Sequence, residues 1–145
     1  MTSRTIKDAD DWGRWLIHIA DMPFPFSISA TKKPKRTEAQ NALIHVWFGV
    51  IALHVGDTPA DDIKAACNLK YGRPLLVRDD PKWAEMWHKC FAGFSHEAKL
   101  DAIGAFDIPF TRRMNVKQLC EYMDQMQRDA AKRGIILEDK EGLGK

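Results

Sequence analysis

The segment KKPKRTEAQN, from Lys32 to Asn41, brings together cations, a helix start and two adjacent amides. Its four cations, with no acid between them, are Lys32, Lys33, Lys35 and Arg36. Thr37 and Gln40 match a capping box, in which the threonine oxygen accepts a helix N–H and the glutamine reaches back. A helix N-terminus presents N–H groups and a partial positive charge, so it suits an anion. The pattern is equally typical of two structures. One is a binding site for a phosphate and a base, and the other is an ordinary basic loop before a capped helix.

Catalytic and metal-binding patterns are missing from the sequence. The five histidines are scattered and form no H-E-x-x-H or other ligand spacing. Asp61–Asp62 and Asp79–Asp80 lie within helix-start signatures, where acids favour the helix dipole. There is no G-x-S-x-G, no P-loop and no Gly-rich dinucleotide turn. We therefore expect a protein without catalytic residues, metal ligands or cofactors; a metal-dependent DNA nuclease, or a remnant of one, is the alternative.

The distribution of charge is more informative than the net charge of +2. Three stretches without acids, residues 22–37, 63–78 and 108–120, hold half of the 22 Lys and Arg residues. Beyond the four cations above, these are Lys64, Lys70, Arg73, Arg78, Arg112, Arg113 and Lys117. If the fold brings the stretches together, they form the basic surface of a nucleic-acid-binding protein. The alternatives are separate solvated faces, or a protein-interaction module whose basic face meets an acidic partner.

Length and composition predict one α+β domain over residues 1–145, mainly helical around a small sheet. Three widely spaced cysteines fit a reducing cytoplasm, and no apolar run is long enough to cross a bilayer. Helical spacing and capping signals predict helices over residues 8–20, 39–55, 58–72, 81–92, 95–103 and 115–133. The predicted caps of the last three are Asp79 or Asp80, Ser95, and Asn115 with Gln118. Short apolar runs predict strands at residues 24–30, 74–77 and 135–137. Residues 138–145 are expected to form a loose tail.

Two of these helices have distinctive apolar patterns. The central helix, Ala39–Val55, is apolar nearly all round, which predicts burial on most sides. The last helix carries a two-heptad apolar seam that suits either the core or a second copy of the chain. Its members are Val116, Leu119, Met123, Met126 and Ala130. We assign the seam to a dimer interface, while the tryptophans Trp12, Trp15, Trp83 and Trp87 are better explained by core packing than by base stacking.

Two blocks of the sequence resemble the phage NinB/Orf family of recombination proteins. Arg36, Thr37, Gln40 and Asn41 match the family's R-[ST]-x-x-Q-N, and TRRMNVKQL, Thr111–Leu119, matches a second block in the same order. The similarity covers a little over half of the chain. Residues 79–107 do not align and are interpreted as an elaboration, and His45 stands where the family commonly has an aromatic residue.

The resemblance implies a non-enzymatic recombination mediator that binds single-stranded DNA and assists recombinase loading. It also implies a homodimer that contacts the host single-strand-binding protein, in the host cytoplasm if the chain is phage-encoded. The expected DNA-binding residues are Lys35, Arg36, Gln40, Asn41, Arg113 and Lys117, with Lys32, Lys33 and Arg112 as auxiliaries. Cations would hold phosphates while the amides contact base edges or sugars.

Overall fold

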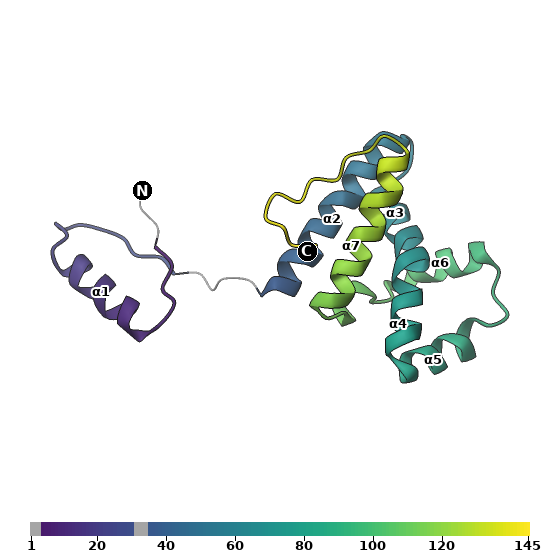
Figure 1. Cartoon of the computed structure of the whole chain (residues 1–145), viewed down its shortest axis with the longest axis horizontal. Helices are drawn as coiled ribbons and strands as arrows, with labels where there is room; N and C mark the ends of the chain where they lie inside the picture. The colour runs from purple at the N-terminus through teal and green to yellow at the C-terminus, as the bar shows by residue number, and fades with distance from the viewer. Residues whose placement is uncertain (1–3, 31–34) are drawn as a thin grey trace. The chain divides into compact units, whose positions relative to one another are not determined.

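The structure, a computed structural model, describes residues 4–30 and 35–145 and is helical throughout its regular elements (Figure 1). The chain divides into two compact units, Met1–Lys33 and Pro34–Lys145, and each is described by itself. No β-strand occurs among the described residues, so the predicted α+β class is wrong and the fold is all-helical. The expectation of a single domain stays a prediction.

The smaller unit contains one helix, α1 (Ala9–Ala20). The side chain of Asp8 caps it by accepting from the backbone N–H of Asp11 at 2.8 Å, as the acidic helix start predicts. No residue of α1 is buried, and the Trp12 side chain is 50% exposed, so the core packing predicted for it is wrong. Residues 24–30 are irregular rather than the predicted strand, and no strand among the residues that the structure describes pairs with them.

The larger unit is built around α2 (Arg36–Val55). The predicted Thr37–Gln40 capping box is wrong: Lys35 is the N-cap, and its backbone N–H donates to the Glu38 carboxylate at 3.3 Å. Only Gln40, Ile44, Trp47 and Phe48 are buried along this helix. The prediction that α2 is buried on most sides is therefore wrong, since an apolar composition does not by itself show that another element covers each face.

Residues 60–79 form one helical segment interrupted by a π turn. It consists of α3 (Ala60–Cys67), the π turn Asn68–Gly72 and α4 (Arg73–Asp79). The strand predicted at residues 74–77 is wrong: proline is tolerated in the first turn of a helix, and the adjacent Leu75 and Leu76 are both buried in the helical form.

Two shorter helices follow, α5 (Pro81–Phe91) and α6 (His96–Phe106). Both capping predictions are confirmed: Asp80 accepts from the N–H of Trp83 at 3.0 Å, and Ser95 accepts from that of Ala98 at 3.1 Å. Trp87 is buried, and its ring is stacked on that of Trp83 with centroids 5.2 Å apart. The core role predicted for Trp87 is thus confirmed.

The last helix, α7 (Val116–Lys132), runs beside α2 (Figure 1). Its predicted cap is confirmed. The Asn115 side chain accepts from the Gln118 N–H at 2.9 Å, and the Gln118 side-chain oxygen accepts from the Asn115 N–H at 3.0 Å. Residues 135–137 are irregular and not the predicted strand; Ile135 and Leu137 are nevertheless buried in the core.

Residues 138–145 are packed against α2 and α7 instead of forming a loose tail. The Asp139 carboxylate organises them by accepting from the backbone N–H groups of Leu143 and Gly144, each at 2.8 Å. The indole N–H of Trp47 donates to the Glu138 carbonyl oxygen at 3.0 Å. Capping of this kind satisfies the backbone of a short segment that belongs to no regular element.

No single helix in the described part of the chain is both long and apolar enough to cross a membrane. By length and composition alone, the bent pair Arg36–Val55 and Ala60–Asp79, at 113°, meets the requirement together.

Candidate nucleic-acid interface

The two sequence blocks lie against each other at the start of α2. The Thr111 hydroxyl, in a 3₁₀ turn at Thr111–Arg113, donates to the Asn41 side-chain oxygen at 2.5 Å, although 70 positions separate them. Next to them, the Gln40 amide nitrogen lies 3.5 Å from the Val116 carbonyl oxygen, where α7 begins. Both matching segments therefore form one local structure.

Gln40 is completely buried and belongs to this structure, not to a surface. Its amide nitrogen donates to the Leu143 carbonyl oxygen at 2.7 Å and to the Cys120 sulfur at 3.3 Å. Its Oε1 atom is buried without a partner among the described residues. The prediction that Gln40 contacts DNA is therefore wrong: with no solvent access, the side chain instead anchors the segment 138–145.

Arg36 is exposed but also binds the chain's own backbone. Its guanidinium donates to the carbonyl oxygens of Leu143, at 3.3 Å, and of Lys145. The residue predicted to hold a phosphate thus already holds two backbone oxygens, and DNA would have to compete with them.

A polar hollow opens beside Asn41, between α2, α3 and the loop after α6. Its volume is about 200 Å³, and we call it the Asn41 hollow. Its lining residues are Asn41, His45, Lys64, Asn68, Asp107, Ile108, Pro109, Phe110, Thr111 and Arg112. Of these, only Asn41 and Arg112 were predicted as site residues. Nothing in the local sequence marks Lys64, Asn68 and Asp107 as neighbours, since they come from different helices and a loop.

Asp107 is the electrostatic centre of the Asn41 hollow. Its carboxylate lies 3.2 Å from the Lys64 ammonium and 3.7 Å from the Arg112 guanidinium. The hydrogen bond from Lys64, then the charges of Lys64 and Arg112, lower the pKa of Asp107 below its usual value. The side chains of Asp107 and Arg112 are exposed and that of Lys64 is 30% exposed, and ion pairs open to solvent stabilise a protein by only about 0–1 kcal/mol. A competing anion can therefore displace the carboxylate at little cost.

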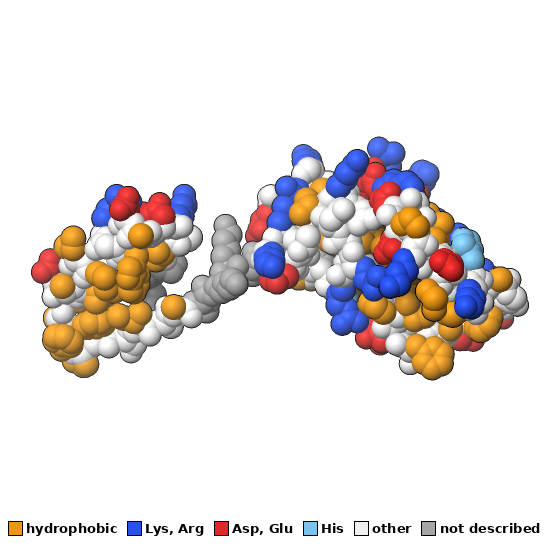
Figure 2. Space-filling model, turned by 90° about the horizontal axis from the view of Figure 1, so that it is seen from below, with side chains coloured by type: hydrophobic (Ala, Val, Ile, Leu, Met, Phe, Trp, Pro, Cys, Tyr) orange, Lys and Arg blue, Asp and Glu red, His pale blue; other side chains and the backbone are white. Residues whose placement is uncertain are grey.

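The other predicted cations are also matched by acids from distant segments. Arg113 lies 3.5 Å from the Asp80 carboxylate, and Lys70 lies 3.0 Å from that of Asp129. On the face of the larger unit seen in Figure 2, Lys and Arg side chains are interspersed with Asp and Glu instead of forming one basic field. For the two later stretches, 63–78 and 108–120, these ion pairs favour the alternative of separate solvated faces over one unneutralised surface.

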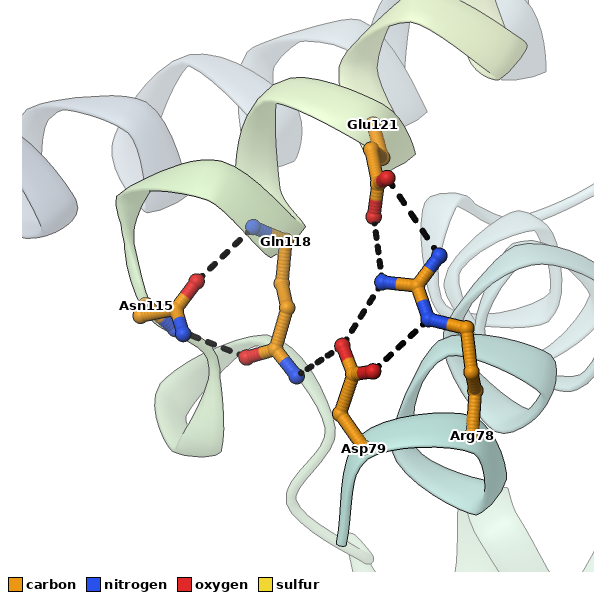
Figure 3. A network of polar contacts seen from close by, with 5 residues as sticks. All are labelled: Arg78, Asp79, Asn115, Gln118 and Glu121. Carbon is orange, nitrogen blue, oxygen red and sulfur yellow. Dashed lines mark hydrogen bonds and ion pairs between the residues drawn. The ribbon is translucent and has the colours of Figure 1, made fainter.

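A polar network joins the start of α7 to the end of α4 (Figure 3). Arg78 pairs with Asp79 at 2.6 Å and with Glu121 at 2.7 Å, and the Gln118 amide donates to Asp79 at 3.1 Å. The hydrogen bonds from Arg78 and Gln118 lower the pKa of Asp79 to about 2. Since Asn115 binds Gln118 in turn, this network fixes the turn that carries Thr111–Arg113 relative to α4.

The remaining predicted DNA-binding residues are not gathered by direct contacts. Lys35 is exposed as the N-cap of α2, and Lys117 is exposed on the first turn of α7. Lys32 and Lys33 lie outside the described residues.

The seam of α7 is part of the core. Leu119, Met123, Met126 and Ala130 are buried within the chain, and Val116 is half-buried. The assignment of the seam to a dimer interface is therefore wrong, because the four buried side chains have no surface to present to a second copy.

A different apolar surface is exposed along α2. Val46 and Leu53 are 60% and 86% exposed, and Ile136, from the segment after α7, is 81% exposed. Val46 and Ile136, together with Ala39, Ala42, Leu43 and Val50, border a groove of about 700 Å³, and Leu53 lies beyond its lining on the same helix. We call it the α2 groove; its rim includes Glu138, Lys140 and Glu141.

Three or more metal-ligating side chains do not cluster anywhere in residues 4–30 or 35–145. Comparisons of the chain with protein-family models, curated proteins and solved structures found no match. The resemblance to the NinB/Orf family therefore stays a prediction based on the two blocks.

Proposed function

We propose that this protein is a DNA-binding recombination mediator of the NinB/Orf kind, non-enzymatic and cytoplasmic. The observation that carries the proposal is the direct contact of Asn41 with Thr111 beside the Asn41 hollow. Two blocks that resemble one family, far apart in sequence, meet at a polar depression bordered by cations. A shared local structure is what a common binding site would require of them.

The binding mode that we propose uses exchangeable ion pairs instead of an uninterrupted basic field. Lys64, Arg112 and Arg113 are each paired with an acid, at least one partner of every pair being substantially exposed. A DNA phosphate can replace the acid in such a pair, since the exposed pair contributes little to stability. Lys35 and Lys117 add cations for further phosphates.

The proposed function is tested by measuring binding to single-stranded, duplex and forked DNA by fluorescence anisotropy at several salt concentrations. We expect preference for single strands and a log–log salt slope of roughly −0.7 for each phosphate contacted. Arg112→Glu should weaken binding and flatten the slope. Lys89→Glu, at an exposed site of α5 outside the Asn41 hollow, is the matched control and should change both quantities much less.

The same assay separates the alternatives. Degradation of the DNA on addition of magnesium would indicate the nuclease alternative. If no DNA binds but an acidic peptide does, the protein-interaction module replaces the proposal. Contacts with a host single-strand-binding protein, and assistance to a recombinase, form part of the proposal and are tested by pull-down and strand-exchange measurements.

Self-association is a second proposed property, favoured by the exposed apolar row along α2. Ala39, Val46 and Leu53 recur at seven-residue intervals on one face, as at a helix–helix seam. Small residues lie at the start of the row and the large Leu53 at its end. Two copies of α2 packed antiparallel would therefore set each leucine against the small residues of the other copy. We propose the α2 groove, in place of the α7 seam, as the homodimer interface.

A further inference from the structure

We propose that the Asn41 hollow receives one unpaired base of the bound strand, an inference that rests on the proposed function. It adds a site of stated chemistry to that function: a pocket for the edge of a nucleobase, formed by residues of α2, α3 and the loop after α6. The residues that it adds to the predicted set are His45, Lys64, Asn68 and Asp107.

The hollow has the hydrogen-bonding groups that a base edge needs. Asn41 and Asn68 each accept a hydrogen bond through Oδ1, from Thr111 at 2.5 Å and from Tyr122 at 2.8 Å. These bonds fix the two side chains and leave the amide N–H groups as donors. Asparagine amides and carboxylates are the groups that read base edges in protein–DNA complexes.

Acceptors lie beside these donors. The Nδ1 atom of His45 is 2.8 Å from the Asn41 carbonyl oxygen, which can only accept, so Nδ1 carries the hydrogen. In the neutral ring Nε2 is then an acceptor. The Asp107 carboxylate is a second acceptor in the lining, and a phosphate that takes its place at Lys64 and Arg112 frees its oxygens for the base. The lining thus combines donors and acceptors, as the edge of any base does.

One wall of the hollow is apolar. Ile108, Pro109 and Phe110 form it, and the Phe110 ring is itself packed in the core against Trp83 and Trp87. The face of a base can pack on such a wall without regard to sequence. Lys64 and Arg112 then lie where the flanking phosphates need cations.

This arrangement gives a physical reason for a preference for single strands. A base in a duplex is stacked and paired, and its removal from the helix costs a few kcal/mol, whereas an unpaired base enters a pocket at less cost. The basic residues alone would hold a duplex phosphate equally well. Selection between the two DNA forms therefore comes from the hollow.

The test compares an intact single-stranded oligonucleotide with the same strand in abasic form, by fluorescence anisotropy. We expect the wild type to bind the intact strand roughly tenfold more tightly, a difference of about 1.4 kcal/mol, because the abasic strand lacks the group that the hollow contacts. Asn41→Ala and His45→Ala should remove most of this ratio. His45 is exposed, so its variant should remain folded even if Asn41→Ala disturbs the turn at Thr111.

Lys117→Ala is the matched control. It removes a proposed phosphate contact outside the hollow, so it should weaken binding to both strands and preserve their ratio. Equal binding of the two strands by the wild type, or an unchanged ratio in both hollow variants, overturns the inference and leaves the proposed function standing. Failure of the wild type to bind either strand overturns both.

Discussion

Replacement of Gln40 tests whether this residue anchors the C-terminal segment. In Gln40→Ala the hydrogen bond to the Leu143 carbonyl oxygen, 2.7 Å long in the wild type, is lost. The side chain is fully buried, so its truncation also leaves a void. Loss of this bond and of the longer one to the Cys120 sulfur, together with an incompletely filled cavity, should lower the free energy of unfolding by about 2–4 kcal/mol.

Gln40→Leu separates the two contributions. Leucine fills nearly the same volume and removes the buried Oε1 atom, which has no partner among the described residues. The Leu143 carbonyl oxygen keeps its bond from Arg36 at 3.3 Å, so no acceptor is left unsatisfied. We therefore expect Gln40→Leu to lie within about 1 kcal/mol of the wild type, since loss of an unsatisfied polar atom offsets loss of a bond.

The measurement is urea-induced unfolding followed by circular dichroism, with hydrogen exchange at the Leu143 and Gly144 amides. Those amides should exchange faster in Gln40→Ala, because the segment that carries them loses an anchor. Gln125→Ala, on the exposed side of α7, is the control and should change stability by less than about 0.5 kcal/mol. If Gln40→Ala changed the free energy of unfolding as little as the control does, Gln40 would not be buried. If Gln40→Leu lost as much stability as Gln40→Ala, the unsatisfied Oε1 atom would not offset the lost hydrogen bond.

Three further predictions concern association, acid stability and packing. In sedimentation, the wild type should be a dimer and Val46→Glu a folded monomer. Met123→Glu should instead unfold the chain, because the Met123 side chain is completely buried. A wild type that is monomeric at micromolar concentration would contradict the α2 interface. Asp79 has a pKa of about 2, against an ordinary 3.8, so its ionised form stabilises the fold above pH 3.8 and this stabilisation is lost as the pH falls towards 2. Thermal melts of Asp79→Asn should therefore depend less on pH in that interval than those of the wild type, and an identical dependence would show that the carboxylate is unpaired in solution. A Cβ at Gly72 would lie 3.0 Å from the Phe110 ring, so Gly72→Ala should cost about 1–3 kcal/mol in urea unfolding, while Gly104→Ala, with nothing within 4 Å, should be neutral or stabilising.

Local signals predicted three of the helix starts well. Asp80, Ser95 and Asn115 cap as expected, because each side-chain oxygen lies next to the first free N–H groups of its helix. The same pattern failed at Thr37 and Gln40, since burial against α7 and the C-terminal segment gives the glutamine better partners. The local sequence pattern of a capping box carries no information about tertiary contacts of that kind.

The three predicted strands failed for a different reason. Runs such as Pro74–Val77 and Ile135–Leu137 are too short for their spacing to distinguish a strand from a buried helical turn or an irregular segment. The α7 seam was identified correctly as an apolar face, but spacing cannot show what covers it. Here α2 and the core cover it, and the exposed apolar row belongs to α2, where an all-round apolar composition hid the exposed face.

The candidate site could be predicted only in part. Asn41 and Thr111 follow from the two blocks, but the acids that pair with the cations come from elsewhere in the sequence, Asp107 with Arg112 and Asp80 with Arg113. A stretch that lacks acids in sequence is therefore a poor guide to surface charge in a small helical fold, where every helix borders several others.

The π turn at Asn68–Gly72 fixes the length of the segment between α2 and α5. A π turn holds about one residue more than an α-helical turn, so these five residues rotate the chain about as far as four α-helical residues would. Each α-helical residue advances the helix by about 100°, so regular α-helical winding of all five would rotate α4 against α3 by roughly that angle. Leu75 and Leu76 would then turn out of the core while Ala65 and Cys67 remained in it. At this chain length, a regular α-helix and burial of both leucines are therefore incompatible, and the π turn allows α3 and α4 to keep their apolar side chains in the core. Deletion of one residue within 68–72 should accordingly convert the π turn to regular α-helix and leave the buried side of α4 in place.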